Sequence, residues 1–379
     1  MTGGETAKNI VIVAGETSGD FHGAHLVRAI RKKDNNIHFC GIGGERLRSE
    51  GVDLVMDAHE LSVVGITEVF AKLPKVFSGI AEIKKTFKTL QPDLMILIDF
   101  PDFNLHIAKL AKKQGVPVLY YISPQIWAWR SGRIKKIRQY VNQMAVILPF
   151  EEDYYRQRNV AASFVGHPLL DYYAEQDTVI PDDNPGDLVI GMLPGSRRSE
   201  IEKNLPVMLA AAPRIQEAFP GIRFLISIAP GIDAEWVSRF ITPYLKNYRV
   251  EQVAGAVQQV FEKSSLILAA SGTVTLETAI FGVPMIIIYR ISEISYRLGR
   301  ALVDVEHIGL VNIIAGERVV PELIQADANP AGIAREAVDI LNHTDRLERV
   351  RHKLKSVRHR LGTPGAAERT ADIALKMLA

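Results

Sequence analysis

Short runs of apolar, β-branched residues alternate with amphipathic stretches along the first half of the chain. Continuous apolar runs predict strands at residues 10–14, 37–42, 94–99, 116–122 and 144–148. Strands that are apolar throughout and are separated by helices indicate a parallel sheet with both faces covered. The pattern therefore predicts a doubly wound α/β domain.

The same alternation restarts after a polar, acidic segment rich in Pro and Gly at residues 171–187, which is typical of a linker. Strands are predicted at 188–193, 223–229, 266–271 and 284–289, and helices at 205–218, 233–245, 255–264 and 273–281. We expect two Rossmann-like domains facing each other across a cleft, the first at residues 1–170 and the second at residues 188–345. A helical tail (346–379) follows, for which packing back on the first domain is one arrangement.

Composition and charge narrow the function classes. The 379 residues include 45 Lys or Arg and 43 Asp or Glu, so the formal charge of +2 does not call for nucleic acid as a partner. Cys40 is the only cysteine, which excludes an internal disulfide and a multi-cysteine metal site. No apolar run approaches the ~20 residues that cross a bilayer. We expect a cytoplasmic protein without a membrane span.

In open parallel sheets, ligands bind beyond the carboxyl ends of the strands, so residues that follow strands are the candidates for chemistry. The first strand runs into "AGETSGD", where Gly15, Glu16 and Ser18 precede a helix. Glycine lets the backbone approach a ligand, although the spacing is not that of a dinucleotide motif. The alternative is a purely structural turn.

Asp99 ends the apolar run "LMILID" and is followed by Asp102 and Asn104. A carboxylate at this place can act as a general base towards a hydroxyl nucleophile. For Asp99 the functional interpretation is favoured. For Asp102 the sequence slightly favours a helix N-cap, and a functional role is the other interpretation.

Two further stretches combine aromatic or apolar residues with cations. In "YYISPQIWAWRSGRIKKIR", Ser123, Trp127 and Trp129 precede five basic residues, which suits a ligand with apolar and anionic parts; core tryptophans are the alternative. Residues 61–88 carry an apolar face flanked by lysines, which suits an anionic membrane surface and suits core packing equally.

In the second half, two junctions between a strand and a helix are candidates for binding a diphosphate. "GMLPGSRRSE" supplies Gly195, Ser196 and Arg197, and the planar guanidinium suits phosphate recognition. "AASGTVTLE" supplies backbone N–H groups and a carboxylate suited to ribose hydroxyls; the candidates there are Ser271, Gly272, Thr273 and Glu277. A chance surface loop and a Thr273 helix cap are the alternatives. No metal-binding motif occurs, and no metal is expected.

These motifs, in order from "AGETSGD", "LIDFPDFN" and "YYISPQIWAW" to "LPGSRRSEI", "AASGTVTLE" and "VPMIIIYR", resemble those of the lipid-A-disaccharide synthase family. The resemblance implies a GT-B glycosyltransferase on the cytoplasmic face of the bacterial inner membrane. It implies an inverting transfer from UDP-2,3-diacylglucosamine to 2,3-diacylglucosamine 1-phosphate. Neither metal nor cofactor is expected, because the UDP-sugar is a substrate. An anionic membrane surface is an expected partner, and a homo-oligomer is one possible state.

By the same resemblance, Asp99 is the base, Arg197 assists departure of UDP, and the other candidates divide between the two substrates. The acceptor set is Gly15, Glu16, Ser18, Asp102, Asn104, Ser123 and Trp127. The donor set is Gly195, Ser196, Arg197, Ser271, Gly272, Thr273, Glu277 and Asn312. Where the family often reads S-L-P-N, this chain has "IGLVN", with Val311 in place of proline. A UDP-sugar epimerase, another GT-B transferase and a non-catalytic binding module are the rival interpretations.

Overall fold

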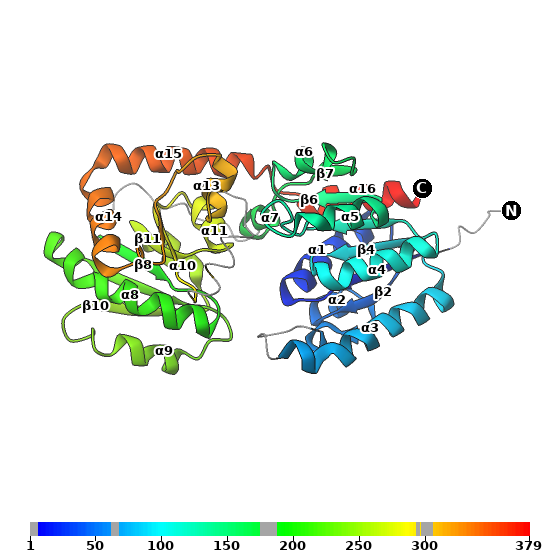
Figure 1. Ribbon diagram of the computed structural model, residues 1–379, viewed down its shortest axis with the longest axis horizontal. Coiled ribbons are helices and arrows are strands. Elements are labelled where there is room, and N and C mark those ends of the chain that lie inside the picture. Colours follow the sequence, from blue (N-terminus) through cyan, green and yellow to red (C-terminus); the bar gives the residue numbers. More distant parts are fainter. Residues whose placement is uncertain (1–6, 62–67, 175–187, 293–295, 297–305) are drawn as a thin grey trace. The chain divides into compact units, whose positions relative to one another are not determined.

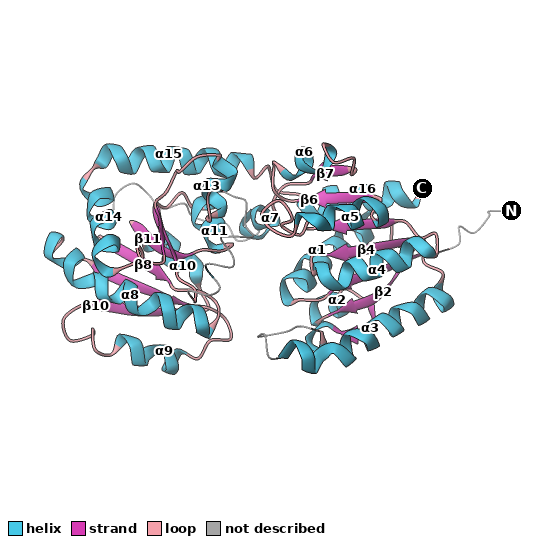
Figure 2. Cartoon of the chain, in the orientation of Figure 1, coloured by secondary structure: helices cyan, strands magenta, loops and turns pink. Residues whose placement is uncertain are grey.

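The computed structural model describes residues 7–61, 68–174, 188–292, 296 and 306–379, with only the backbone of residues 68–73. The chain divides into two compact units: unit 1 is Met1–Tyr172 with Leu361–Ala379, and unit 2 is Tyr173–Arg360. Within each unit helices flank a sheet, as Figures 1 and 2 show. The predicted two-domain α/β class is confirmed, and the cleft between the domains stays a prediction.

Unit 1 is built on a seven-stranded sheet with the order β3-β2-β1-β4-β5-β6-β7. Its strands are β1 (Lys8–Ala14), β2 (Ile37–Gly43), β3 (Asp53–Asp57), β4 (Leu94–Ile98), β5 (Val118–Tyr121), β6 (Gln143–Val146) and β7 (Ala162–Phe164). Its helices are α1 (Thr17–Lys33), α2 (Glu45–Ser49), α3 (Glu68–Leu90), α4 (Pro101–Lys113), α5 (Ile134–Tyr140), α6 (Glu151–Arg156), α7 (Pro168–Ala174), which reaches into unit 2, and α16 (Ala366–Leu378).

The two faces of this sheet bury alternate residues of each strand. Ile10 and Ile12 of β1 pack with residues of α1, α2 and α16, whereas Val11 and Val13 pack with residues of α3 to α6. All four side chains are 0% exposed, which is why the strand reads as one continuous apolar run. The buried, paired strands therefore anchor the residues that follow them.

Unit 2 repeats the plan with a six-stranded sheet in the order β10-β9-β8-β11-β12-β13. Its strands are β8 (Val189–Leu193), β9 (Arg223–Ile228), β10 (Arg249–Ala254), β11 (Leu266–Ala270), β12 (Met285–Tyr289) and β13 (Glu322–Ile324). Its helices are α8 (Arg198–Ala218), α9 (Ala234–Ile241), α10 (Val257–Lys263), α11 (Val274–Ile280), α13 (Leu310–Ala315), α14 (Pro330–Asn342) and α15 (Thr344–Arg360).

The sequence segment expected as one C-terminal tail is divided between the units. Helix α15 belongs to unit 2, whereas α16, drawn in red in Figure 1, belongs to unit 1 and packs against α1. Ala367, Ala371 and Ala374 of α16 join the core on the α1 side of the sheet. The last helix of the chain therefore completes the first domain.

Candidate active site

In unit 1 the strand order reverses between β1 and β4, which pair in parallel with Ala14 opposite Ile98. Gly15 and Glu16 follow β1, and Asp99 follows β4, so these residues emerge from adjacent strand ends. This is the switch point at which open parallel sheets bind ligands. Glu16 and Ser18 are exposed there, and Asp99 is partly exposed.

The backbone around Asp99 is held in an unusual conformation. Asp99 and Phe100 both have positive φ angles, 44° and 46°, a region that non-glycine residues seldom adopt. The Asp99 carbonyl oxygen accepts hydrogen bonds from Asn104 Nδ2 at 2.7 Å and from Tyr120 Oη at 2.5 Å. These bonds fix the turn that presents the Asp99 carboxylate.

Asn104 therefore has a different part from the one expected. Its side chain is 0% exposed, and Nδ2 also donates to the Ile98 carbonyl oxygen at 3.1 Å. Direct contact of Asn104 with an acceptor is not supported, because the side chain is buried and Nδ2 is engaged by the backbone of the turn, although Oδ1 has no hydrogen-bond partner there. It is a positioning residue for Asp99.

The environment of the Asp99 carboxyl suits proton transfer near neutral pH. Burial and the nearby Glu16 carboxylate raise its pKa to about 6, although a backbone hydrogen bond from Phe100 opposes the shift. A base titrating in this range is mostly ionised at pH 7 and still takes up a proton readily. The geometry thus supports Asp99 as a general base.

Gly15 is required by the close approach of Phe100. A Cβ at Gly15 would lie 2.2–2.6 Å from three carbons of the Phe100 ring. Phe100 directly follows Asp99, so the ring cannot move without disturbing the turn.

Gly15→Ala is expected to lower stability by about 1–3 kcal/mol, as overpacked sites do, and to reduce turnover because Asp99 shifts. Thermal unfolding and initial rates check this. Gly132→Ala is the stability control, since its Cβ would meet no atom within 4 Å. An unchanged melting temperature and rate for Gly15→Ala would show that Phe100 does not set the turn.

The loop after β5 places Ser123 and Trp127 beside buried polar groups. Ser123 is 6% exposed, and its hydroxyl is 2.6 Å from Tyr155 Oη. Trp127 Nε1 donates to Glu151 Oε1 at 3.1 Å. Ser123 is thus engaged inside the protein, and its predicted contact with the acceptor is not supported; Trp127 remains partly exposed.

Glu151 was not singled out from the sequence. It is 1% exposed, and Oε2 accepts a hydrogen bond from the Leu148 N–H at 3.1 Å. Burial raises the pKa of Glu151 to about 7, against the lowering effect of its hydrogen bonds from Leu148 and Trp127. No local pattern marks a buried glutamate in "LPFEED", because its partner Trp127 is distant in sequence.

Asp102 lies in the first turn of α4, so the N-cap interpretation is wrong. Phe100 occupies the cap position and Pro101 the first helical position, for which proline is suited. The Asp102 side chain is 76% exposed and forms ion pairs with Arg130 and Arg133. Its carboxylate therefore belongs to a surface cluster beside the Asp99 turn.

Unit 2 brings its candidates together at the corresponding switch point. Strands β8 and β11 are neighbours, with Leu193 opposite Ala269. The segment from Gly195 to Arg197 follows β8, and the segment from Ser271 to Thr273 follows β11. Both predicted phosphate-binding segments thus emerge from adjacent strand ends.

The segment after β8 is shaped by Glu200. Gly195 has φ 126°, and a Cβ there would lie 2.5 Å from Glu200 Oε2. That oxygen accepts the Ser196 N–H at 3.0 Å, and Arg197 Nη1 is 3.5 Å from Glu200 Oε1. The Arg197 side chain is 76% exposed. The guanidinium is therefore available to an anion, and Glu200 is a positioning residue that the sequence did not reveal.

The segment after β11 leads into α11, where Gly272 and Thr273 are exposed. Thr273 occupies the N-cap position, but its side chain forms no capping bond, so the capping alternative is not supported. Ser271 Oγ is 3.4 Å from the Ile308 carbonyl oxygen. Burial raises the pKa of Glu277 to about 7, and a hydrogen bond from Tyr173 opposes this. A partly exposed Glu277 stays a candidate for ribose hydroxyls.

Asn312 is a structural residue in this fold. It is 0% exposed; Nδ2 donates to the Val320 carbonyl oxygen and to Glu322, and Oδ1 accepts the N–H groups of Val319 and Val320. Its predicted contact with the donor is not supported, because the amide is fully engaged.

Val311 lies buried in the first turn of α13. This is a position at which proline is tolerated, so the exchange of proline for valine is compatible with the same helix start.

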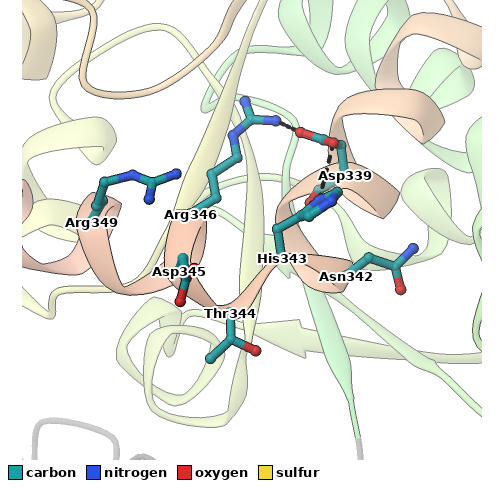
Figure 3. Close-up of a pocket in the computed structure, with 7 residues that line it drawn as sticks. All are labelled: Asp339, Asn342, His343, Thr344, Asp345, Arg346 and Arg349. Atoms are coloured by element: carbon teal, nitrogen blue, oxygen red, sulfur yellow. Dashed lines mark hydrogen bonds and ion pairs between the residues drawn. The ribbon is translucent and has the colours of Figure 1, made fainter.

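A surface pocket at the turn from α14 to α15 contains none of the predicted site residues. It is lined by Asp339, Asn342, His343, Thr344, Asp345, Arg346 and Arg349. Figure 3 shows Arg346 and His343 directed towards Asp339: Arg346 forms an ion pair with the carboxylate, and His343 Nδ1 lies 2.8 Å from the Asp339 carbonyl oxygen. The pocket is therefore not part of the candidate site. In the described part of the chain, no group of three or more acidic, His or Cys side chains is arranged to hold a metal.

Comparison with solved structures shows the fold. The glycosyltransferase of kitacinnamycin superposes with a TM-score of 0.67 at 14% identity, covering 99% of this chain and 100% of that one. A UDP-N-acetylglucosamine 2-epimerase from Neisseria meningitidis, bound to UDP-GlcNAc, gives 0.61 at 12% identity, covering 97% and 99%. At such identities the likeness concerns the GT-B architecture alone.

Comparison of sequences is more specific. Residues 10–377 match the lipid-A-disaccharide synthetase family. The lipid-A-disaccharide synthase of Syntrophus aciditrophicus is 47% identical over 377 residues, covering 98% of both chains. That of Geobacter metallireducens is 45% identical over 379 residues, covering 98% of this chain and 97% of the relative. The chain therefore belongs to the lipid-A-disaccharide synthase family of GT-B glycosyltransferases.

Proposed function

We propose that this protein transfers a 2,3-diacylglucosaminyl unit from UDP to the 6-hydroxyl of 2,3-diacylglucosamine 1-phosphate, with inversion. The products are the β-1,6 disaccharide 1-phosphate and UDP. Family membership supports nucleotide-sugar and lipid-sugar substrates. The observation that carries the proposal is Asp99, a partly buried carboxyl with a pKa of about 6 at the switch point of unit 1.

On the acceptor side, Asp99 takes the proton of the 6-hydroxyl as its oxygen attacks C1 of the donor sugar. Glu16 and Ser18, exposed at the same strand ends, are suited to hydrogen-bond the sugar. Gly15 keeps the space that Phe100 needs, and Asn104 fixes the backbone of Asp99. The acceptor's acyl chains would exclude water and strengthen this proton transfer.

On the donor side, the bond between C1 and the UDP oxygen breaks, and negative charge develops on the departing diphosphate. The Arg197 guanidinium is suited to stabilise that charge, since it can form two parallel hydrogen bonds to phosphate. Ser196 and the segment from Ser271 to Thr273 supply further donors. Glu277 would accept ribose hydroxyls. We expect the reaction to proceed without a metal.

A peripheral membrane contact through α3 fits these substrates. Phe77 is 66% exposed on α3, and Lys75, Lys84 and Lys85 are exposed on the same helix. An exposed aromatic ring among lysines suits a bilayer with anionic lipids. Residues 62–67, part of the predicted apolar face, lie outside the described residues. No helix in the described ranges has the length and apolar character needed to span a bilayer. The cytoplasmic face of the inner membrane is the proposed location.

The test is to incubate the purified protein with both acylated substrates and to determine the mass of the lipid product. We expect a disaccharide 1-phosphate and one UDP per product. Conversion of the UDP-sugar without any acceptor would instead favour an epimerase. Tight UDP binding with no product would favour a binding module and would contradict the proposal.

A further inference from the structure

Next to the Asp99 turn, four side chains form a cluster that the catalytic scheme leaves unused: Asp102, Trp129, Arg130 and Arg133, here called the arginine cluster. The side chains of Asp102 and Arg130 are 76% and 52% exposed, whereas that of Arg133 is 11% exposed and lies at the inner edge of the cluster. Trp129 is 42% exposed, which is unusual for tryptophan. The Arg130 and Arg133 guanidinium carbons lie 4.6 Å and 5.5 Å from its ring centroid. Both cations therefore contact a partly exposed aromatic ring.

Asp102 holds both guanidinium groups in place. Its carboxylate accepts hydrogen bonds from Arg130 Nη1, at 3.1 Å to Oδ2, and from Arg133 Nη2. Two positive charges face one negative charge, so the cluster retains a net charge of about +1. Arg130 also has a positive φ of 54°, a strained conformation of the kind found at ligand sites.

The arginine cluster lies beside the proposed base. Asp102 is in the first turn of α4, and this helix begins at Pro101, two residues after Asp99. Burial raises the pKa of the Tyr120 phenol, and the charges acting on that phenol include those of Asp99 and Arg133. Tyr120 Oη in turn donates to the Asp99 carbonyl oxygen. The Asp102 carboxylate that pairs with Arg133 stands three residues after Asp99 in the chain.

We propose that Arg130 and Arg133 bind the 1-phosphate of the acceptor, while Trp129 packs against its sugar ring. This inference deepens the proposed function and rests on it. A phosphate monoester next to a sugar is the ligand that matches two fixed guanidinium groups beside an exposed indole. The phosphate exchanges for Asp102 as the partner of the guanidinium groups. The arginine cluster then selects a phosphorylated acceptor and orients the acceptor's 6-hydroxyl towards Asp99.

The experiment compares two acceptors, 2,3-diacylglucosamine 1-phosphate and the same compound without phosphate, for the wild type and for Arg130→Ala and Arg133→Ala. The wild type is expected to prefer the phosphorylated acceptor in kcat/KM. Hydrogen bonds to charged groups predict a loss of that preference of roughly 10- to 100-fold in each variant. The loss should appear mainly in KM for the phosphorylated acceptor, with little change for the other acceptor.

Arg138→Ala, an exposed cation on α5, controls for general loss of positive charge and should keep the preference. Arg133→Lys retains the positive charge but lacks the planar guanidinium, so this variant should keep part of the preference for the phosphorylated acceptor. Equal loss with both acceptors, or no loss with either, would overturn the inference, as would a wild type without preference. If the wild type formed no disaccharide with the phosphorylated acceptor and none with the other acceptor, the proposed function itself would be overturned, and with it this inference.

Discussion

Asp99→Asn is expected to reduce disaccharide formation by roughly 10²- to 10⁴-fold, the usual contribution of a positioned base. Asparagine has nearly the same shape and tolerates positive φ, so the turn at Asp99 and Phe100 should persist. UDP binding, which we assign to unit 2, should be unchanged. Initial rates and calorimetric UDP titrations of the same preparation measure both. Turnover near the wild-type rate would remove Asp99 as the base.

The same variant is expected to be more stable than the wild type at neutral pH. The pKa of Asp99 rises from 3.8 to about 6 on folding, so its ionisation opposes folding. This penalty, on the order of 2–3 kcal/mol at 1.36 kcal/mol per pKa unit, is full above pH 6 and disappears as the pH falls towards 3.8. Denaturant unfolding at pH 7.5 and pH 4.5 checks that the stability gain shrinks in acid. Lower activity together with higher stability in Asp99→Asn would show that the Asp99 carboxylate serves function and not folding.

Arg197→Ala is expected to lower kcat by roughly 10²- to 10³-fold, as loss of a donor to a developing anion does. Its KM for the UDP-sugar should rise less, because the charge on the diphosphate grows as the bond breaks. Steady-state kinetics with varied donor separates the two effects.

The matched control is Arg198→Ala, since the Arg198 guanidinium carbon lies 5.2 Å from the Trp236 ring centroid and has no assigned part in catalysis. Arg197→Lys should recover part of the rate because it keeps the charge. Equal losses in Arg197→Ala and Arg198→Ala would indicate a general effect of charge on the loop.

The fold follows from the sequence wherever strands are buried on both faces. All of the predicted strands are interior strands of the two sheets, and the unpredicted ones, β3, β7, β10 and β13, are the sheet edges. β10 reads "RVEQVA" and is largely exposed or half-exposed, so its pattern is not apolar. β7 and β13 are three residues long. Edge strands have a neighbour on one side only, and short or polar edges limit unwanted pairing.

The candidate site shows a similar division. Asp99, Glu16 and Arg197 could be found because they follow strands, and the topology then places them at switch points. The backbone contacts of Asn104 and Asn312 could not be predicted, since whether an amide faces a ligand or its own backbone depends on packing. For the same reason, the sequence could not predict the hydrogen bonds that Glu151 accepts from Trp127 and that Glu200 accepts from the Ser196 N–H. Sequence spacing indicates which residues reach a sheet edge, whereas tertiary contacts decide which of them stay free.

The pH profile of kcat/KM for the wild type and Glu16→Gln tests the central claim, that Asp99 is the base. We predict an acid limb near pH 6 for the wild type, and a lower midpoint for Glu16→Gln because the Glu16 carboxylate helps to raise the pKa of Asp99. A phosphate monoester also titrates near pH 6, but the titration of a substrate would not respond to a change at Glu16. A midpoint that stays the same in Glu16→Gln, or a profile without an acid limb, would contradict the account.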